Sequence, residues 1–175
     1  MRQRSILILA LAAAALALIP SGALADSATH TYVLEMEAQN FGVAANGNRV
    51  AIEGEGMFSV HPKSVEASGT FTHTDAAGKV LARGTWTATQ LLTYQSYGCG
   101  VVFGNDIPDN LCGGKVKMRV LLETPLGELS GILTVFCVIG DHRPSSAVEG
   151  TTLVVPGHVN FNHSAGGENV YIQTS

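Results

Sequence analysis

The chain has 175 residues, of which 46% are hydrophobic and only 14% are charged, and its formal net charge is −4. Low charge combined with 20 glycines is typical of a compact β-protein and excludes a disordered, charge-rich chain. The acidic balance argues against nucleic acid or an anionic lipid surface as a partner, because both attract basic proteins.

The first 25 residues have the pattern of a secretory signal peptide. Arg2 and Arg4 precede an apolar run over residues 6–19, and an Ala-Leu-Ala site follows at residues 23–25. The apolar run is too short for a typical transmembrane helix. We therefore predict cleavage after this site and a secreted or periplasmic location. We predict a single domain over residues 26–175. Without the two arginines of the signal, this domain has 10 − 2 = 8 basic residues and 14 acidic residues.

Alternating side chains predict the first two strands after the signal. Residues 29–38 place Tyr32 and Leu34 on one side, as expected of a strand with one buried face. Residues 49–61 repeat this pattern, whereas the Asn-Phe-Gly and Asn-Gly-Asn sequences within residues 40–48 indicate turns.

The longest predicted hairpin covers residues 64–97 and turns at residues 75–78. The register that best separates apolar from polar side chains has Thr74 opposite Lys79, and it leaves a Thr-rich face for solvent. The small and apolar residues then share the inward face, which comprises Val65, Ala67, Gly69, Phe71 and His73 with Val80, Ala82, Gly84, Trp86 and Ala88.

In this register Gly69 and Gly84 face each other. Glycine within a strand commonly marks a bend or the close approach of another backbone, so the hairpin is expected to curl. Trp86, the only tryptophan, is interpreted as a core anchor, with a ligand-stacking platform as the alternative.

A second hairpin joins residues 115–123 to residues 128–139 through Thr-Pro-Leu-Gly, which is favourable turn chemistry. With Glu123 opposite Glu128, the apolar residues of the two strands line up and Cys137 points inward.

The rest of the chain indicates loops and short strands. Residues 98–114 are interpreted as a long loop, which is uncommon unless it is functional or tied down. No sustained 3.6-residue period follows the signal, so little helix is expected. Three short final strands are predicted at residues 151–155, 158–162 and 169–174. In total about eight to nine strands predict an all-β fold, either an antiparallel β-barrel or a two-sheet β-sandwich.

The exported chain has three cysteines, so one disulfide and one free thiol are expected. The preferred pairing is Cys99–Cys137, which would link a strand end to a distant strand. Cys99–Cys112 would close a local loop and is the alternative. Chain entropy gives roughly 4 kcal/mol for the first bond and roughly 3 kcal/mol for the second, which does not decide between them.

Three segments together resemble a group of known proteins: the run SGTFTHTDAAGKVLARGTW, the later QSYGCG, and LTVFCVIG. The central half of the chain is similar to small exported proteins of bacteria and archaea that have no assigned function. The resemblance implies an all-β fold and export, and it carries no catalytic residue across.

The inward aromatic residues point to a binding role. A barrel of about eight strands can hold one small molecule, and a small apolar ligand would contact Phe58, Phe71, His73 and Trp86. The six histidines lack the spacing of metal sites, so neither a metal nor another cofactor is expected.

These features support three hypotheses about function. The preferred one is a secreted β-domain without catalysis that has a binding or structural role. The alternative is a barrel that binds a small apolar ligand in its interior. The third is an enzyme whose site at the barrel mouth uses His73, Asp141 or His142.

Overall fold

The computed structural model describes residues 29–175, and the predicted signal peptide lies outside this range. The described residues form strands and no helix, which confirms the all-β class. The strands are β1 (Thr31–Met36), β2 (Asn40–Val43), β3 (Arg49–Ser59), β4 (Ser64–Thr74), β5 (Val80–Cys99), β6 (Val101–Val102), β7 (Asn105–Asp106), β8 (Leu111–Thr124), β9 (Gly127–Cys137), β10 (Gly150–Val154), β11 (His163–Ser164) and β12 (Asn169–Gln173).

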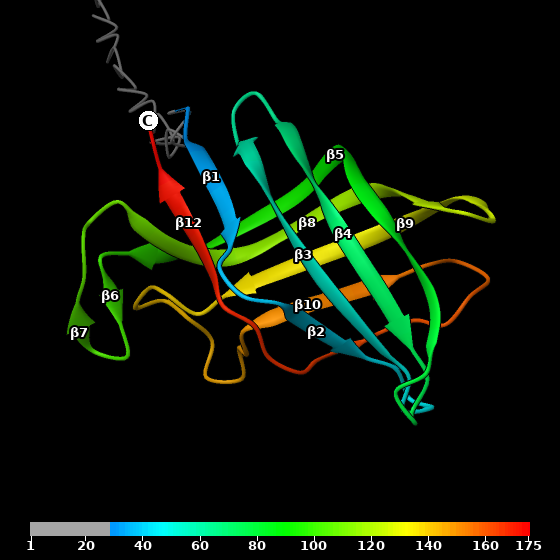
Figure 1. Cartoon of the computed structure of the whole chain (residues 1–175). Coiled ribbons are helices and arrows are strands. Elements are labelled where there is room, and N and C mark those ends of the chain that lie inside the picture. Colours follow the sequence, from blue (N-terminus) through cyan, green and yellow to red (C-terminus); the bar gives the residue numbers. More distant parts are fainter. Residues whose placement is uncertain (1–28) are drawn as a thin grey trace, which may run out of the picture.

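One 10-stranded antiparallel sheet contains most of these strands, and neighbours follow the order β1-β12-β8-β5-β4-β3-β2-β11. β9 pairs with β8 and β10, and β1 pairs with β3 as well as with β12. Figure 1 shows β3 and β4 crossing in front of β8, β9 and β10, whereas β5 bends and continues alongside β8. The small β6–β7 hairpin projects at one edge of the molecule.

The second hairpin pairs as predicted. Glu123 of β8 lies opposite Glu128 of β9, and the strands continue to the pair Thr124–Gly127, so the loop is only two residues long. Cys137 at the end of β9 is buried, as the alternation of side chains predicted.

The first hairpin keeps most of the predicted inward residues but pairs two residues away from the predicted register. Phe71 lies opposite Gly84 and Trp86 opposite Gly69, so the predicted pairing of Gly69 with Gly84 is wrong. A shift of two residues leaves the side chains of the paired arms on their predicted faces, because side chains on a strand alternate with a period of two. Val80 is the exception: it was predicted to face inward, but it pairs with Thr74 beyond the bulge and is exposed.

The shift arises at the turn. The Asp75 carboxylate accepts hydrogen bonds from the backbone N–H groups of Ala77 and Lys79, both at 2.9 Å. A bulge precedes Thr74, which pairs with Val80 instead of Lys79. Side-chain bonding within the turn and the extra residue of the bulge reset the register of both arms.

Trp86 is the largest of the fully buried side chains, and its indole lies across two glycines. Gly54 of β3 pairs with Gly69 of β4, which in turn pairs with Trp86. A Cβ atom at either glycine would collide with the indole and with the backbone of the next strand. The indole N–H donates a hydrogen bond of 3.0 Å to the carbonyl oxygen of Glu53. The glycines therefore make room for the ring and bring three strands close together.

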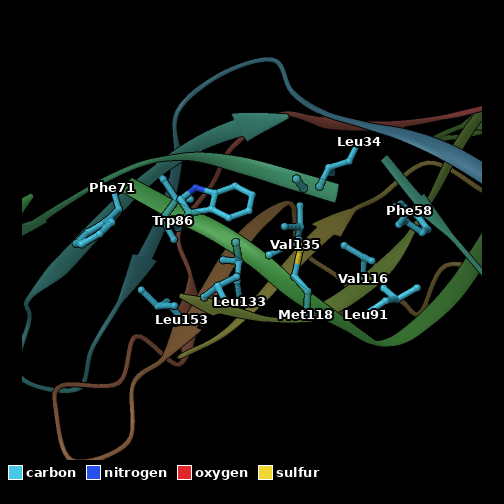
Figure 2. Close-up of a cluster of buried hydrophobic side chains, with 14 of the residues drawn as sticks. Leu34, Phe58, Phe71, Trp86, Leu91, Val116, Met118, Leu133, Val135 and Leu153 are labelled. Atoms are coloured by element: carbon cyan, nitrogen blue, oxygen red, sulfur yellow. The ribbon is translucent and has the colours of Figure 1, made fainter. Parts of the chain in front are cut away.

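A group of aromatic rings fills the core on the far side of Trp86 from Phe71 (Figure 2). The centroid of the Phe58 ring lies 5.0 Å from those of Tyr32 and Tyr94 and 5.5 Å from that of Tyr171. Such contacts stabilise the core beyond the area that they bury.

Three predictions about irregular segments are wrong. Residues 40–43, predicted to lie in a turn, form β2 and pair with β3. β8 already begins at Leu111, and β6 and β7 take up more of the segment predicted as one loop. Residues 158–162, predicted as a strand, contribute only an isolated bridge at Phe161.

The disulfide joins Cys99 to Cys112, so the preferred pairing of Cys99 with Cys137 is wrong. The two bonded cysteines are direct partners in the ladder between β5 and β8. The sequence pattern assigned Cys112 to a loop, but the early start of β8 brings it opposite Cys99. Cys137 is a buried free thiol, and it contacts the carbonyl oxygen of Cys112 at 3.5 Å.

We predict that Gly69→Ala lowers the free energy of unfolding by about 2 kcal/mol or more, because the added methyl group collides with the indole of Trp86 and the backbone of β3. Urea denaturation measures this loss. Ser68→Ala is the matched control on the exposed face of the same strand, and it is expected to change stability by less than about 0.5 kcal/mol. Equal midpoints for the two variants would contradict the close packing of the indole on glycine.

The cysteine arrangement predicts one thiol that reacts only after unfolding. Burial raises the pKa of Cys137 to about 12, so the folded protein holds almost no thiolate there. Titration with a thiol reagent is expected to find no reactive thiol in the native protein and one in denaturant. Peptide mapping is expected to recover Cys99 linked to Cys112, and a peptide joining Cys99 to Cys137 would overturn the assignment.

Candidate functional site

A mainly apolar hollow lies where the ends of two hairpins meet. We call it the hairpin-end pocket, and its volume is about 380 Å³. Its walls come from the ends of β4 and β8, the starts of β3, β5 and β9, and the segment that follows β10. Its lining is mainly apolar: Val50, Phe71, His73, Ala82, Leu122, Thr124, Leu126, Gly127, Glu128, Leu129, Leu153, Val155, His158, Val159 and Phe161.

Two of the four residues predicted to contact a ligand line this pocket. Phe71 and His73 reach it because alternate residues of β4 face inward. Trp86 and Phe58 do not line it. The indole of Trp86 is held over the glycines of β3 and β4, and Phe58 packs among the aromatic rings on the other side of the indole (Figure 2).

His73 is the main polar group of the inner wall. Its Nε2 lies 3.0 Å from Nδ2 of Asn48, and its ring meets the edge of Phe161 with centroids 5.1 Å apart. Burial lowers the pKa of His73, and the nearby carboxylate of Asp75 only partly offsets this effect. The neutral ring accepts from the Asn48 amide at Nε2, which leaves Nδ1 as a hydrogen-bond donor.

The chain after β10 supplies a wall that the sequence did not reveal. Phe161 is buried and exchanges two backbone hydrogen bonds with Leu153, at 2.8 and 3.1 Å. The Pro-Gly turn at residues 156–157 was recognisable in the sequence, but the return of the following residues across the pocket was not. Leu126, at the tip of the β8–β9 hairpin, is 98% exposed and borders the opening.

Of the three residues proposed for an enzyme site, Asp141 and His142 are in contact, but His73 lies elsewhere on the sheet. The Nδ1 atom of His142 lies 3.0 Å from the Asp141 carboxylate, and both side chains are exposed. His142 hydrogen-bonds through its backbone to Tyr97 near the end of β5, whereas His73 pairs with Ala82 near the start of that strand. A general acid or base must lie within hydrogen-bond reach of its partner, and His73 is not within reach of the exposed pair Asp141–His142.

Residues 29–175 contain no group of three or more His, Cys, Asp or Glu side chains arranged to hold a metal ion. No helix in the same range is long and apolar enough to cross a membrane.

A cluster of polar groups joins the ends of several strands away from the pocket. The side-chain amide of Asn169 donates to Oδ1 of Asn40 at 2.7 Å and to the carbonyl oxygen of Phe136 at 2.9 Å. The carboxylate of Glu149 accepts from the backbone N–H of Val138 at 2.7 Å and from that of Asn169 at 2.9 Å. The asparagines are 129 positions apart, so no local pattern indicates the cluster.

Glu149 is a titratable group within this cluster. Burial raises its pKa to about 7, although the hydrogen bonds from Val138 and Asn169 act in the opposite direction. A carboxyl group with this pKa changes charge near neutral pH, where an exposed glutamate is fully ionised.

Neither a protein-family model, nor a curated protein, nor a solved structure matches this chain.

The raised pKa of Glu149 predicts a pH-dependent stability. Between pH 4.5 and 7 the folded protein retains a proton that the unfolded chain releases, so this group's contribution to stability is lost as pH rises through that range. Urea denaturation of wild type and Glu149→Gln isolates the effect. Between pH 4.5 and 7, the free energy of unfolding of the wild type is expected to fall by about 1 to 2 kcal/mol relative to that of the variant. This value is smaller than the full pKa shift implies, because solvent screens a partly exposed carboxyl group. Parallel pH profiles would contradict the assignment.

Proposed function

We propose that this protein is exported, loses residues 1–25, and acts as a single non-catalytic domain that binds a small apolar ligand in the hairpin-end pocket. The observation that carries the proposal is the pocket itself. Its volume of about 380 Å³ falls within the range of about 300 to 1,000 Å³ typical of small-molecule sites. Its walls are mainly aliphatic and aromatic, so burial of an apolar molecule there is favourable.

We infer further that the sheet closes into a barrel. β1 pairs with both β3 and β12, and β12 pairs with β8, so the ladder through β3, β4, β5 and β8 returns to β1. A closed sheet leaves few exposed edges and encloses an interior. This closure supports a pocket that is shaped before a ligand arrives.

His73 defines the polar requirement of the ligand. Because the ring is neutral and its Nε2 is already engaged by Asn48, its Nδ1–H can donate one hydrogen bond into the pocket. The fitting ligand is therefore an uncharged apolar molecule with at most one carbonyl, ether or hydroxyl oxygen. An anionic ligand would lose its hydration without gaining an opposite charge from the neutral His73 ring.

Export is supported by two independent features. The first 25 residues have the order of a signal peptide, with a basic start, a short apolar run and a small-residue cleavage site. The Cys99–Cys112 bond requires an oxidising compartment to persist. A binding role without nucleic acid fits the acidic balance of residues 26–175.

The binding proposal is tested with N-phenyl-1-naphthylamine, an uncharged probe whose fluorescence rises in apolar surroundings. We expect saturable binding by wild type and a Kd raised about tenfold or more by Ala82→Phe, whose ring would fill the pocket. Thr87→Phe adds the same ring on the exposed face of β5 and is expected to bind as wild type does. Equal affinities for the two variants, or no saturable binding by wild type, would overturn the proposal.

A further inference from the structure

A second hollow lies on the outer surface of the sheet and shares no residue with the hairpin-end pocket. We call it the outer groove, and its volume is about 520 Å³. Its floor is the outward face of β8, β9 and β10, and its rims are the loop before β10 and the short strand β11. The residues that line it are Gln95, Tyr97, Lys115, Phe136, Pro144, Ser146, Ala147, Val148, Thr152, Asn162, His163 and Ser164.

The charge of the outer groove is opposite to that of the whole protein. None of its lining residues is acidic, although the chain carries a net charge of −4. Within residues 29–175, no carboxylate lies within salt-bridge distance of Lys115, whose cross-strand neighbours are Gln95 and Phe136. Glu149 is close in sequence to the rim, but its oxygens accept hydrogen bonds from Val138 and from the chain at the start of β12. An anion in the groove therefore meets a cation without a nearby competing charge.

The other side chains of the groove suit a hydroxyl-rich molecule. Phe136 is half-buried on the outward face of β9, beside Lys115 in the ladder, and offers an apolar surface next to the ammonium group. Gln95 and Asn162 are exposed and carry amides that both donate and accept hydrogen bonds. The half-buried Thr152 adds a hydroxyl group. An apolar face combined with amides and hydroxyls matches the faces and edges of a sugar ring.

From this combination we infer that the outer groove is a binding site for an acidic saccharide. Lys115 pairs with the carboxylate of the sugar, Phe136 packs against the ring, and Gln95 and Asn162 hydrogen-bond its hydroxyl groups. The outer groove is separate from the hairpin-end pocket, because the two hollows share no lining residue.

The test uses digalacturonate as the probe and follows the backbone amide signals of the full exported domain by NMR. We expect saturable shifts at residues of the outer groove, with a Kd in the millimolar range. The methyl ester of the same disaccharide keeps the rings but lacks the charge, and acetate keeps the charge but lacks the rings. Both are expected to bind about tenfold more weakly than digalacturonate. The ester loses one charge-assisted hydrogen bond, and acetate loses the contact of the ring.

Two lysine variants distinguish the site from general attraction of anions. Lys115→Met is expected to weaken digalacturonate binding about tenfold. Lys117 lies two residues from Lys115 on the same face of β8 but does not line the groove. Lys117→Met is therefore expected to leave the Kd unchanged. Equal losses in the two variants, equal binding of the ester, or shifts that avoid the groove would each overturn the inference. The comparison of acid and ester needs only the wild-type protein, so it decides the matter even if a variant fails to fold.

Discussion

The fit of the Trp86 indole over Gly54 and Gly69 is the constraint on which the rest of the structure depends. The ring needs the space that two absent side chains leave, and it ties β5 to β3 through its hydrogen bond to Glu53. Only one register of β4 and β5 brings Trp86 opposite Gly69. That register fixes which residues meet across the long hairpin and how closely three strands pack.

The indole also divides the interior into two regions with different roles. On one side, Phe58, Tyr32, Tyr94 and Tyr171 pack against one another, and the buried Tyr171 hydroxyl donates to the carbonyl oxygen of Val135 at 2.9 Å. Large rings with satisfied hydroxyls leave little space there. On the other side, smaller residues such as Ala82 leave the hairpin-end pocket unfilled. The packed region stabilises the sheet, and the unfilled region supplies the candidate binding site.

The surface of the sheet carries local groups of charge of both signs. β1 and β3 bring Glu35 opposite Glu55, where the two like-charged carboxylates repel each other and attract cations. β8 carries Lys115 and Lys117 on its outward face, where they lie opposite Phe136 and Thr134 of β9. The acidic total therefore conceals a local surface of the opposite sign, and net charge alone would have excluded the anionic ligand that the outer groove fits.

Alternation of side chains in the sequence determined the all-β class, most of the inward residues of both long hairpins, and the register of β8 with β9. It also indicated Phe71 and His73, which line the pocket. The tertiary structure alone decided which residues meet across the sheet. The turn at Asp75 shifted one register by two residues, and the early start of β8 paired Cys99 with Cys112. Phe58 and Trp86 point inward as predicted but lie away from the pocket, because alternation fixes the face of a side chain and not its neighbours along the interior. Those neighbours depend on contacts between distant segments, such as Phe161 with Leu153, for which a single sequence contains no local signal.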